Sequence, residues 1–140
     1  MGHVMRIETW DIVLAREIAA AEHLTFQWGH HDCAVWTFDV IAKLQGRESL
    51  ADQWRGAYSS RVGASRTMRL LGWSSLADAA GKLLGVVSQP AAFAARGSLV
   101  LIQNGKIQAL GVCIGNSSAF LAPAGLEIRP TEACSYSWVV

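Results

Sequence analysis

The sequence changes character at Ser98, and this change is what most constrains the fold. Before it, apolar residues recur at helical spacing between capping residues and glycines. After it, short β-branched and aliphatic runs follow one another, and Asn104-Gly105 between two of them is a strong signal for a tight hairpin. Helices followed by strands predict an α+β domain, with N-terminal helices packed on a C-terminal antiparallel β-sheet.

The ends of the predicted helices are marked by residues suited to capping. Thr9 precedes the first helix and Asp32 the second, and both residue types accept hydrogen bonds from free N–H groups at a helix start. Gly46 follows the second helix, where glycine adopts the left-handed backbone that ends many helices. We expect helices over 10–22, 33–44, 64–71 and 75–84, a connector over 88–97, and strands over 98–102, 106–114, 119–122, 126–128 and 135–140.

Length and composition exclude several classes of protein. A chain of 140 residues is expected to form one domain, 1–140, that buries about 68% of its unfolded surface. Its formal net charge is +1 and it has no Lys or Arg run, so we expect no nucleic-acid partner. No apolar stretch is long enough for a membrane span, and MGHVMRIETW has no signal-peptide core, so synthesis in the cytoplasm is expected. Charged residues make up only 16% of the chain, which favours contacts with a protein partner.

The chain has three cysteines, and they are far apart in sequence. Cys33, Cys113 and Cys134 lack the CxxC spacing of zinc and redox sites, so we expect no disulfide framework, no metal and no cofactor. The alternative is a metal or iron-sulfur site formed by the three cysteines and a histidine. It requires Cys113 to lie on the sheet face nearest Cys33.

The stretch WGHHDCAVW, residues 28–36, gathers most of the groups suited to bond-breaking chemistry. Cys33 would be the first residue of a helix, where free N–H groups and the helix dipole stabilise a thiolate. A cysteine nucleophile also needs an imidazole, and His30 or His31 would have to fold back over the helix start to supply one. Asp32 is expected to cap the helix, and its charge would raise the pKa of a nearby thiol.

Two tryptophans flank this stretch. Trp28 and Trp36 are candidates for the lining of a cleft beside Cys33, and the alternative is ordinary core packing.

The motifs WGHHDCAVW, SLVLI and ALGVCIGNSSAFLAPAG resemble those of the NlpC-type cell-wall cysteine peptidases, which have a reduced papain-like α+β fold. The resemblance implies a nucleophile at Cys33, a catalytic histidine at the start of a strand and a third polar residue before Ala-Pro. These last two positions fall on Ala109 and Leu121, which are apolar. Ala109 and Cys113 share a strand face, so we expect Ala109 to point where the imidazole should be.

A second resemblance covers nearly the whole chain. FQWGHHDCAVW, DQWRGAYSSRVGASRTMRLLGWSSLADA, ALGVCIG and the late Trp138 resemble a small domain family of unknown function. It is encoded in the tail-assembly gene clusters of phages and prophages, beside the tail hub and the central tip protein. The resemblance implies a component of the virion tail tip whose partners are these two proteins.

Together the two resemblances predict a tail-tip structural component with a degenerate NlpC-like fold and no catalysis. The alternative is a peptidoglycan endopeptidase that uses Cys33, with His30 or His31, during genome entry. A third possibility is a module that binds a cell-wall peptide without cutting it.

Overall fold

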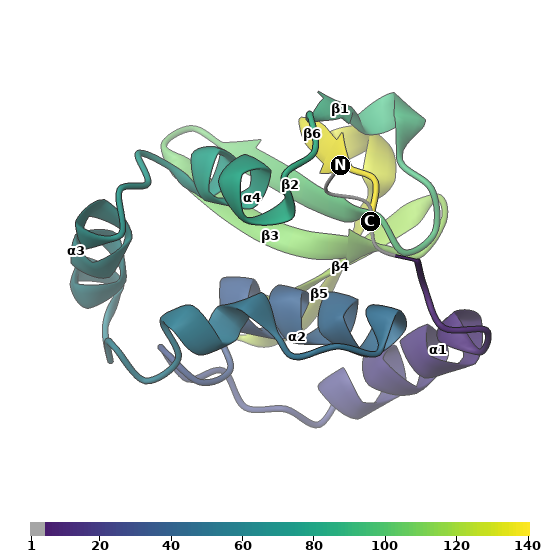
Figure 1. Ribbon diagram of the computed structural model, residues 1–140, viewed down its shortest axis with the longest axis horizontal. Coiled ribbons are helices and arrows are strands. Elements are labelled where there is room, and N and C mark those ends of the chain that lie inside the picture. Colours follow the sequence, from purple (N-terminus) through teal and green to yellow (C-terminus); the bar gives the residue numbers. More distant parts are fainter. Residues whose placement is uncertain (1–4) are drawn as a thin grey trace.

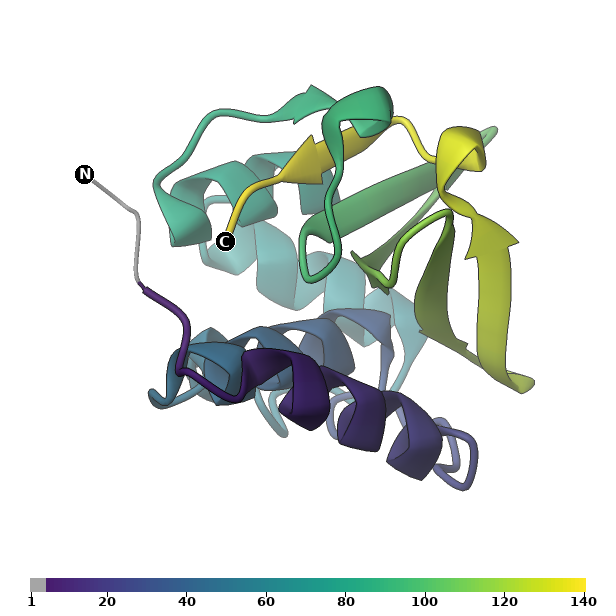
Figure 2. The same ribbon diagram turned by 90° about the vertical axis from the view of Figure 1, so that its right-hand side faces the viewer.

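A computed structural model describes residues 5–140, so part of the N-terminal stretch examined for a signal peptide lies outside the described residues. The chain forms a helical layer packed on a six-stranded antiparallel sheet, which confirms the predicted α+β class and the order of helices before strands (Figure 1). Figure 2 shows the two layers from the side. No helix within residues 5–140 is long and apolar enough to cross a membrane.

The helices follow their local signals closely, with two exceptions. The Asp32 side chain caps α2, and Gly46 ends it in the left-handed conformation at φ 63°. Thr9 is the N-cap residue of α1 as predicted, but its side chain makes no capping hydrogen bond. The third helix begins at Arg61, three residues earlier than predicted, because Ser60 accepts a hydrogen bond from the N–H of Gly63. The helices are α1 (Trp10–Ala21), α2 (Cys33–Gln45), α3 (Arg61–Leu70) and α4 (Leu76–Leu84), with 3-10 turns η1 (Leu50–Gln53), η2 (Ala91–Phe93) and η3 (Thr131–Ala133).

The sheet has the strand order β1-β6-β2-β3-β4-β5. Strand β1 lies in the predicted connector and pairs with β6; a two-residue strand that contains a proline gives no pattern that the sequence could reveal. The strands are β1 (Gln89–Pro90), β2 (Leu99–Asn104), β3 (Ile107–Cys113), β4 (Ser117–Ala122), β5 (Gly125–Pro130) and β6 (Tyr136–Trp138).

Apolar side chains cover both faces of the sheet. The face toward the helices carries the main core, in which Leu110 of β3 and Leu121 of β4 pack with residues of α1, α2 and α4. The opposite face carries a smaller core under the 3-10 turns, and Cys113, Phe120 and Cys134 belong to it. Strands β2, β3 and β4 therefore send alternate side chains into two different cores.

The pairing between β3 and β4 is short, and this shapes the site described below. β3 and β4 pair only at Val112 with Ala119 and at Cys113 with Ser118, whereas β3 pairs with β2 from Ile107 to Val112. From Gly111 back toward Ile107, β3 is therefore separated from β4, on the side where α2 begins.

Gly111 has no room for a side chain at the point where β3 and β4 separate. A Cβ atom there would lie 2.4 Å from the carbonyl oxygen of Ala119 and 2.5 Å from the ring of Phe120. We expect Gly111→Ala to lower the free energy of unfolding by about 1–3 kcal/mol, because overpacking must displace backbone. Denaturant unfolding measures this.

Gly81→Ala is the matched control. Gly81 lies inside α4, and its Cβ would meet nothing closer than 3.9 Å. Alanine there should raise the free energy of unfolding by about 0.5–1 kcal/mol. Equal effects of the two substitutions would contradict the close approach of β4 at Gly111.

Candidate functional site

The site is organised around the carboxylate of Asp32, which is only 2% exposed. One oxygen accepts a hydrogen bond from the N–H of Val35 at 2.9 Å and so caps α2. The other accepts from the N–H of Gly29 at 2.9 Å and from the hydroxyl of Tyr58 at 2.5 Å. Burial, followed by the hydrogen bond to this carboxylate, raises the pKa of Tyr58 well above its usual value, so the phenol stays a donor.

Gly29 brings the loop before α3 onto the turn that precedes α2. Its φ is 84°, and a Cβ there would lie 2.2 Å from the carbonyl oxygen of Tyr58. Its own carbonyl accepts from the N–H of Gly56 at 2.9 Å. Only glycine permits both the backbone conformation and the close approach. Sequence reasoning missed Tyr58, because nothing in its neighbourhood signals a partner 26 residues away.

Cys33 lies at the start of α2 as predicted, but its thiol is not activated. Burial raises the pKa of Cys33 to about 11. The N–H of Leu110 lowers this pKa, whereas the charge of Asp32 raises it further. Burial therefore outweighs the stabilisation of a thiolate by the helix start. A thiol with this pKa is almost wholly protonated near neutral pH.

Neither His30 nor His31 is placed to act as a base for Cys33. Both are exposed, and within residues 5–140 no histidine hydrogen-bonds to Cys33 or contributes to its pKa shift. The two residues belong to a turn in which the main chains of Gln27 and His31 pair, and the ring of His30 lies beside Gly56.

The side chains of the sheet on the side of Cys33 are apolar. Leu110 and Leu121 are fully buried in the main core, against which Cys33 packs. Ala109 and Cys113 do share a strand face, but they pack in the smaller core on the opposite side, so the prediction that this face is nearest Cys33 is wrong. The alternation of a strand fixes which residues share a face but not which face meets a helix.

The same finding overturns the alternative of a site built from three cysteines. Cys113 and Cys134 are both in the smaller core, and the sheet separates them from Cys33. Within the described part of the chain, no three His, Cys, Asp or Glu side chains gather in a way that could hold a metal ion.

A cavity of about 840 Å³ opens beside Cys33. Of the residues singled out in the sequence, Trp28, Asp32, Cys33 and Leu121 line it, and Ala109 lines it from the opposite face of the sheet, where β3 and β4 are not paired. Trp36 was also a candidate, but it is 4% exposed and packs in the core, so that prediction is wrong.

Three aromatic residues that sequence reasoning had not placed in the site also line the cavity. Tyr58 bonds to Asp32 as described, and the rings of Trp54 and Trp73 meet edge to face with centroids 5.5 Å apart. Trp54 makes a second edge-to-face contact, with Phe38 of α2. Such pairs fix ring positions, so this wall of the cavity is well ordered.

Fold and site together define an α+β domain in which a partly buried cysteine at a helix start packs against the apolar face of an antiparallel sheet. The chain belongs to the family described as Domain of unknown function (DUF6950), which matches residues 5–140. No curated protein matches the chain in sequence.

The raised pKa of Cys33 predicts a distinctive reaction with iodoacetamide. Near pH 7 Cys33 should be alkylated much more slowly than a free cysteine, whose pKa is about 8.5. Its rate should keep rising up to about pH 11, because the reactive thiolate forms only there. Peptide mapping by mass spectrometry separates Cys33 from the other two cysteines. Fast alkylation near pH 6 would contradict the assignment.

Asp32 and Tyr58 should be energetically coupled. Asp32→Ala leaves buried donors without an acceptor and should lower the free energy of unfolding by about 1–3 kcal/mol. Tyr58→Phe should cost less, and the double variant should cost at least about 0.5 kcal/mol less than the sum. Additive costs would show that the 2.5 Å hydrogen bond contributes nothing to stability.

Proposed function

We propose that this chain is a non-catalytic component of a phage tail tip with a degenerate NlpC-like fold. The observation that carries this proposal is the environment of Cys33: its pKa is raised to about 11, and the core against which it packs includes Leu110 and Leu121 from the sheet. A cysteine peptidase needs a thiolate and an imidazole that exchanges protons with it. Neither requirement is met in residues 5–140.

The residues around Cys33 have a structural role that does not depend on catalysis. Asp32 caps α2 and ties down the loop before α3, whether or not the next residue reacts. Cys33 packs as a small apolar group against the main core. A peptidase site that lost its imidazole would therefore keep the Asp-Cys pair for packing.

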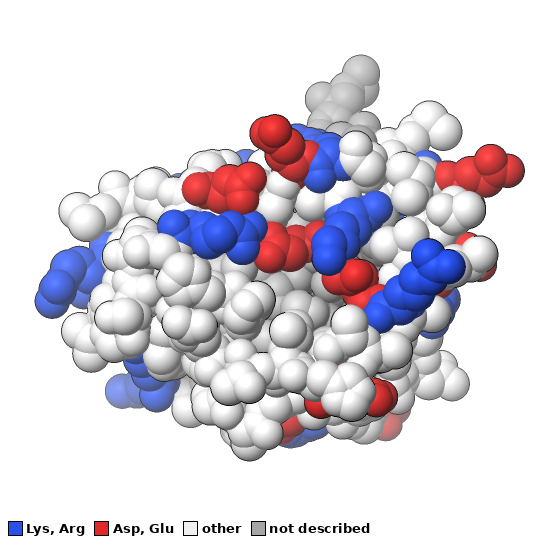
Figure 3. All heavy atoms as spheres, turned by 90° about the horizontal axis from the view of Figure 1, so that it is seen from below, with Lys and Arg blue, Asp and Glu red and all other residues white. Residues whose placement is uncertain are grey.

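The surface supports a role in protein contacts. On the outer face of the helical layer, acidic and basic side chains lie close together (Figure 3). Lys43 of α2 pairs with Glu17 of α1 at 2.7 Å, and Arg55 pairs with Asp39 of α2 at 2.6 Å. Large apolar side chains are exposed elsewhere, notably Leu70, Val87 and Phe93 at 81%, 84% and 67%. The partners we propose are the tail hub and the central tip protein, met in the virion after synthesis in the host cytoplasm.

The proposal predicts that the purified full chain does not cleave peptidoglycan. In a zymogram it should leave the cell-wall layer intact, while an active NlpC-type peptidase clears it. Cys33→Ser, His30→Ala and His31→Ala should change nothing. Lysis that is lost in Cys33→Ser would instead establish the alternative, a peptidoglycan endopeptidase with Cys33 as nucleophile.

Association with tail proteins is a separate test. Co-expressed with the hub and central tip proteins of its own gene cluster, the chain should co-elute with at least one of them in size-exclusion chromatography. Purified particles should contain it. If it is missing from particles and elutes alone, the tail-tip role is wrong even when no lysis is seen.

A further inference from the structure

The cavity beside Cys33 has an apolar interior whose wall is incomplete on one side. Trp28, Trp54 and Trp73 line it, together with Leu110 and Leu121 from the sheet. Because β3 and β4 are not paired between Ile107 and Gly111, residues of both strands line the cavity. At about 840 Å³ it lies within the range of 300–1,000 Å³ typical of small-molecule sites.

Helix α3 forms the outer wall of this cavity. No residue of α3 is buried, although Ala64, Thr67 and Met68 face the cavity. Figure 1 shows α3 at one end of the molecule. A helix with so little buried surface gains little from packing, so a ligand under it would add contacts that the empty site lacks.

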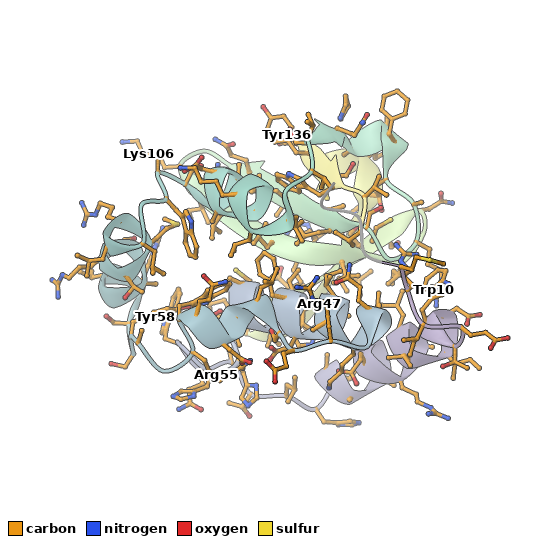
Figure 4. All side chains as sticks on the ribbon, in the orientation of Figure 1. Trp10, Arg47, Arg55, Tyr58, Lys106 and Tyr136 are labelled. Atoms are coloured by element: carbon orange, nitrogen blue, oxygen red, sulfur yellow. The ribbon has the colours of Figure 1, made fainter. Side chains whose placement is uncertain are left out.

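The charges at the cavity are unbalanced. Arg61, the first residue of α3, and Lys106, on the turn between β2 and β3, both line it. Figure 4 shows Tyr58 below α3 and Lys106 above it, on that turn. Within residues 5–140 neither Arg61 nor Lys106 forms an ion pair or a side-chain hydrogen bond.

The acidic groups of the cavity do not neutralise these two cations. Asp32 is held by its three donors, and Glu127 pairs with Arg129 at 3.6 Å. Two cations without partners at an aromatic and aliphatic cavity complement a ligand with an apolar body and an anionic end. A cationic or zwitterionic ligand would lack this match.

We propose that this cavity binds an amphiphilic carboxylate, with its apolar chain among Trp28, Trp54 and Trp73 and its carboxylate at one of the two lining cations at opposite ends of α3, Arg61 or Lys106. The site is independent of the tail-tip role, since it needs no partner protein. It is also independent of Cys33 chemistry, because no bond is made or broken.

Dodecanoate is the probe, and dodecyltrimethylammonium, with the same chain and the opposite charge, is its control. Isothermal titration calorimetry on the full chain should show saturable binding of dodecanoate below its micelle concentration, with an accompanying change in tryptophan fluorescence. The cationic amphiphile should bind at least about tenfold more weakly. Absence of saturable dodecanoate binding, or equal binding of both probes, would overturn the proposal.

Two matched pairs of variants place the ligand. Ala64→Phe fills the cavity and should weaken dodecanoate binding about tenfold, whereas Val62→Phe, on the same helix but 67% exposed and outside the lining, should not. If Ala64→Phe binds like the unchanged chain, the ligand lies elsewhere.

The second pair tests the anionic end. Arg61→Glu with Lys106→Glu should weaken dodecanoate binding, while Arg66→Glu with Arg69→Glu changes the net charge equally on exposed positions outside the lining and should not. An acidic residue at the start of α3 suits the helix dipole, so Arg61→Glu should fold. Thermal unfolding of each variant confirms the fold. If both pairs weaken dodecanoate binding equally, the effect is due to overall charge alone, and the assignment of Arg61 and Lys106 to the site is wrong.

Discussion

The buried carboxylate of Asp32 is the interaction on which the rest of the site depends. A carboxylate at 2% exposure is tolerable only when hydrogen bonds replace its water. Its three donors come from the turn before α2, from α2 itself and from the loop before α3. One side chain thus sets where α2 starts, where Cys33 sits and how the loop before α3 is attached.

The same arrangement keeps the Cys33 thiol protonated, although a helix start by itself favours the thiolate. The negative charge of Asp32 and the burial of Cys33 both oppose a thiolate, and the free N–H groups at the helix start do not overcome them. With Leu110 and Leu121 on the facing sheet, the space beside Cys33 is suited to holding an apolar group. The helix start at Cys33 and the apolar cavity then belong to one arrangement, in which the surroundings of the thiol favour packing over ionisation.

Sequence patterns predicted elements whose signals are local. The Asp32 cap, the end of α2 at Gly46 and the hairpin that turns at Gly105 and Lys106 each depend on residues within one turn, so their identities suffice. The strand β1 was missed because two residues carry no periodicity, and Tyr58 because its partner is 26 residues away. Trp36 was misplaced because either face of a mostly buried helix accepts an aromatic ring.

By itself, the sequence determined the α+β class, the cap that starts α2 at Cys33, and the apolar character of Ala109 and Leu121. Only the tertiary structure decided that Leu110 rather than Ala109 shares the core with Cys33, and that both histidines of the motif face solvent. The reason is physical. Helix caps and tight turns are closed by neighbours in sequence, whereas the face that a strand presents, and the cavity it leaves, depend on how distant segments pack.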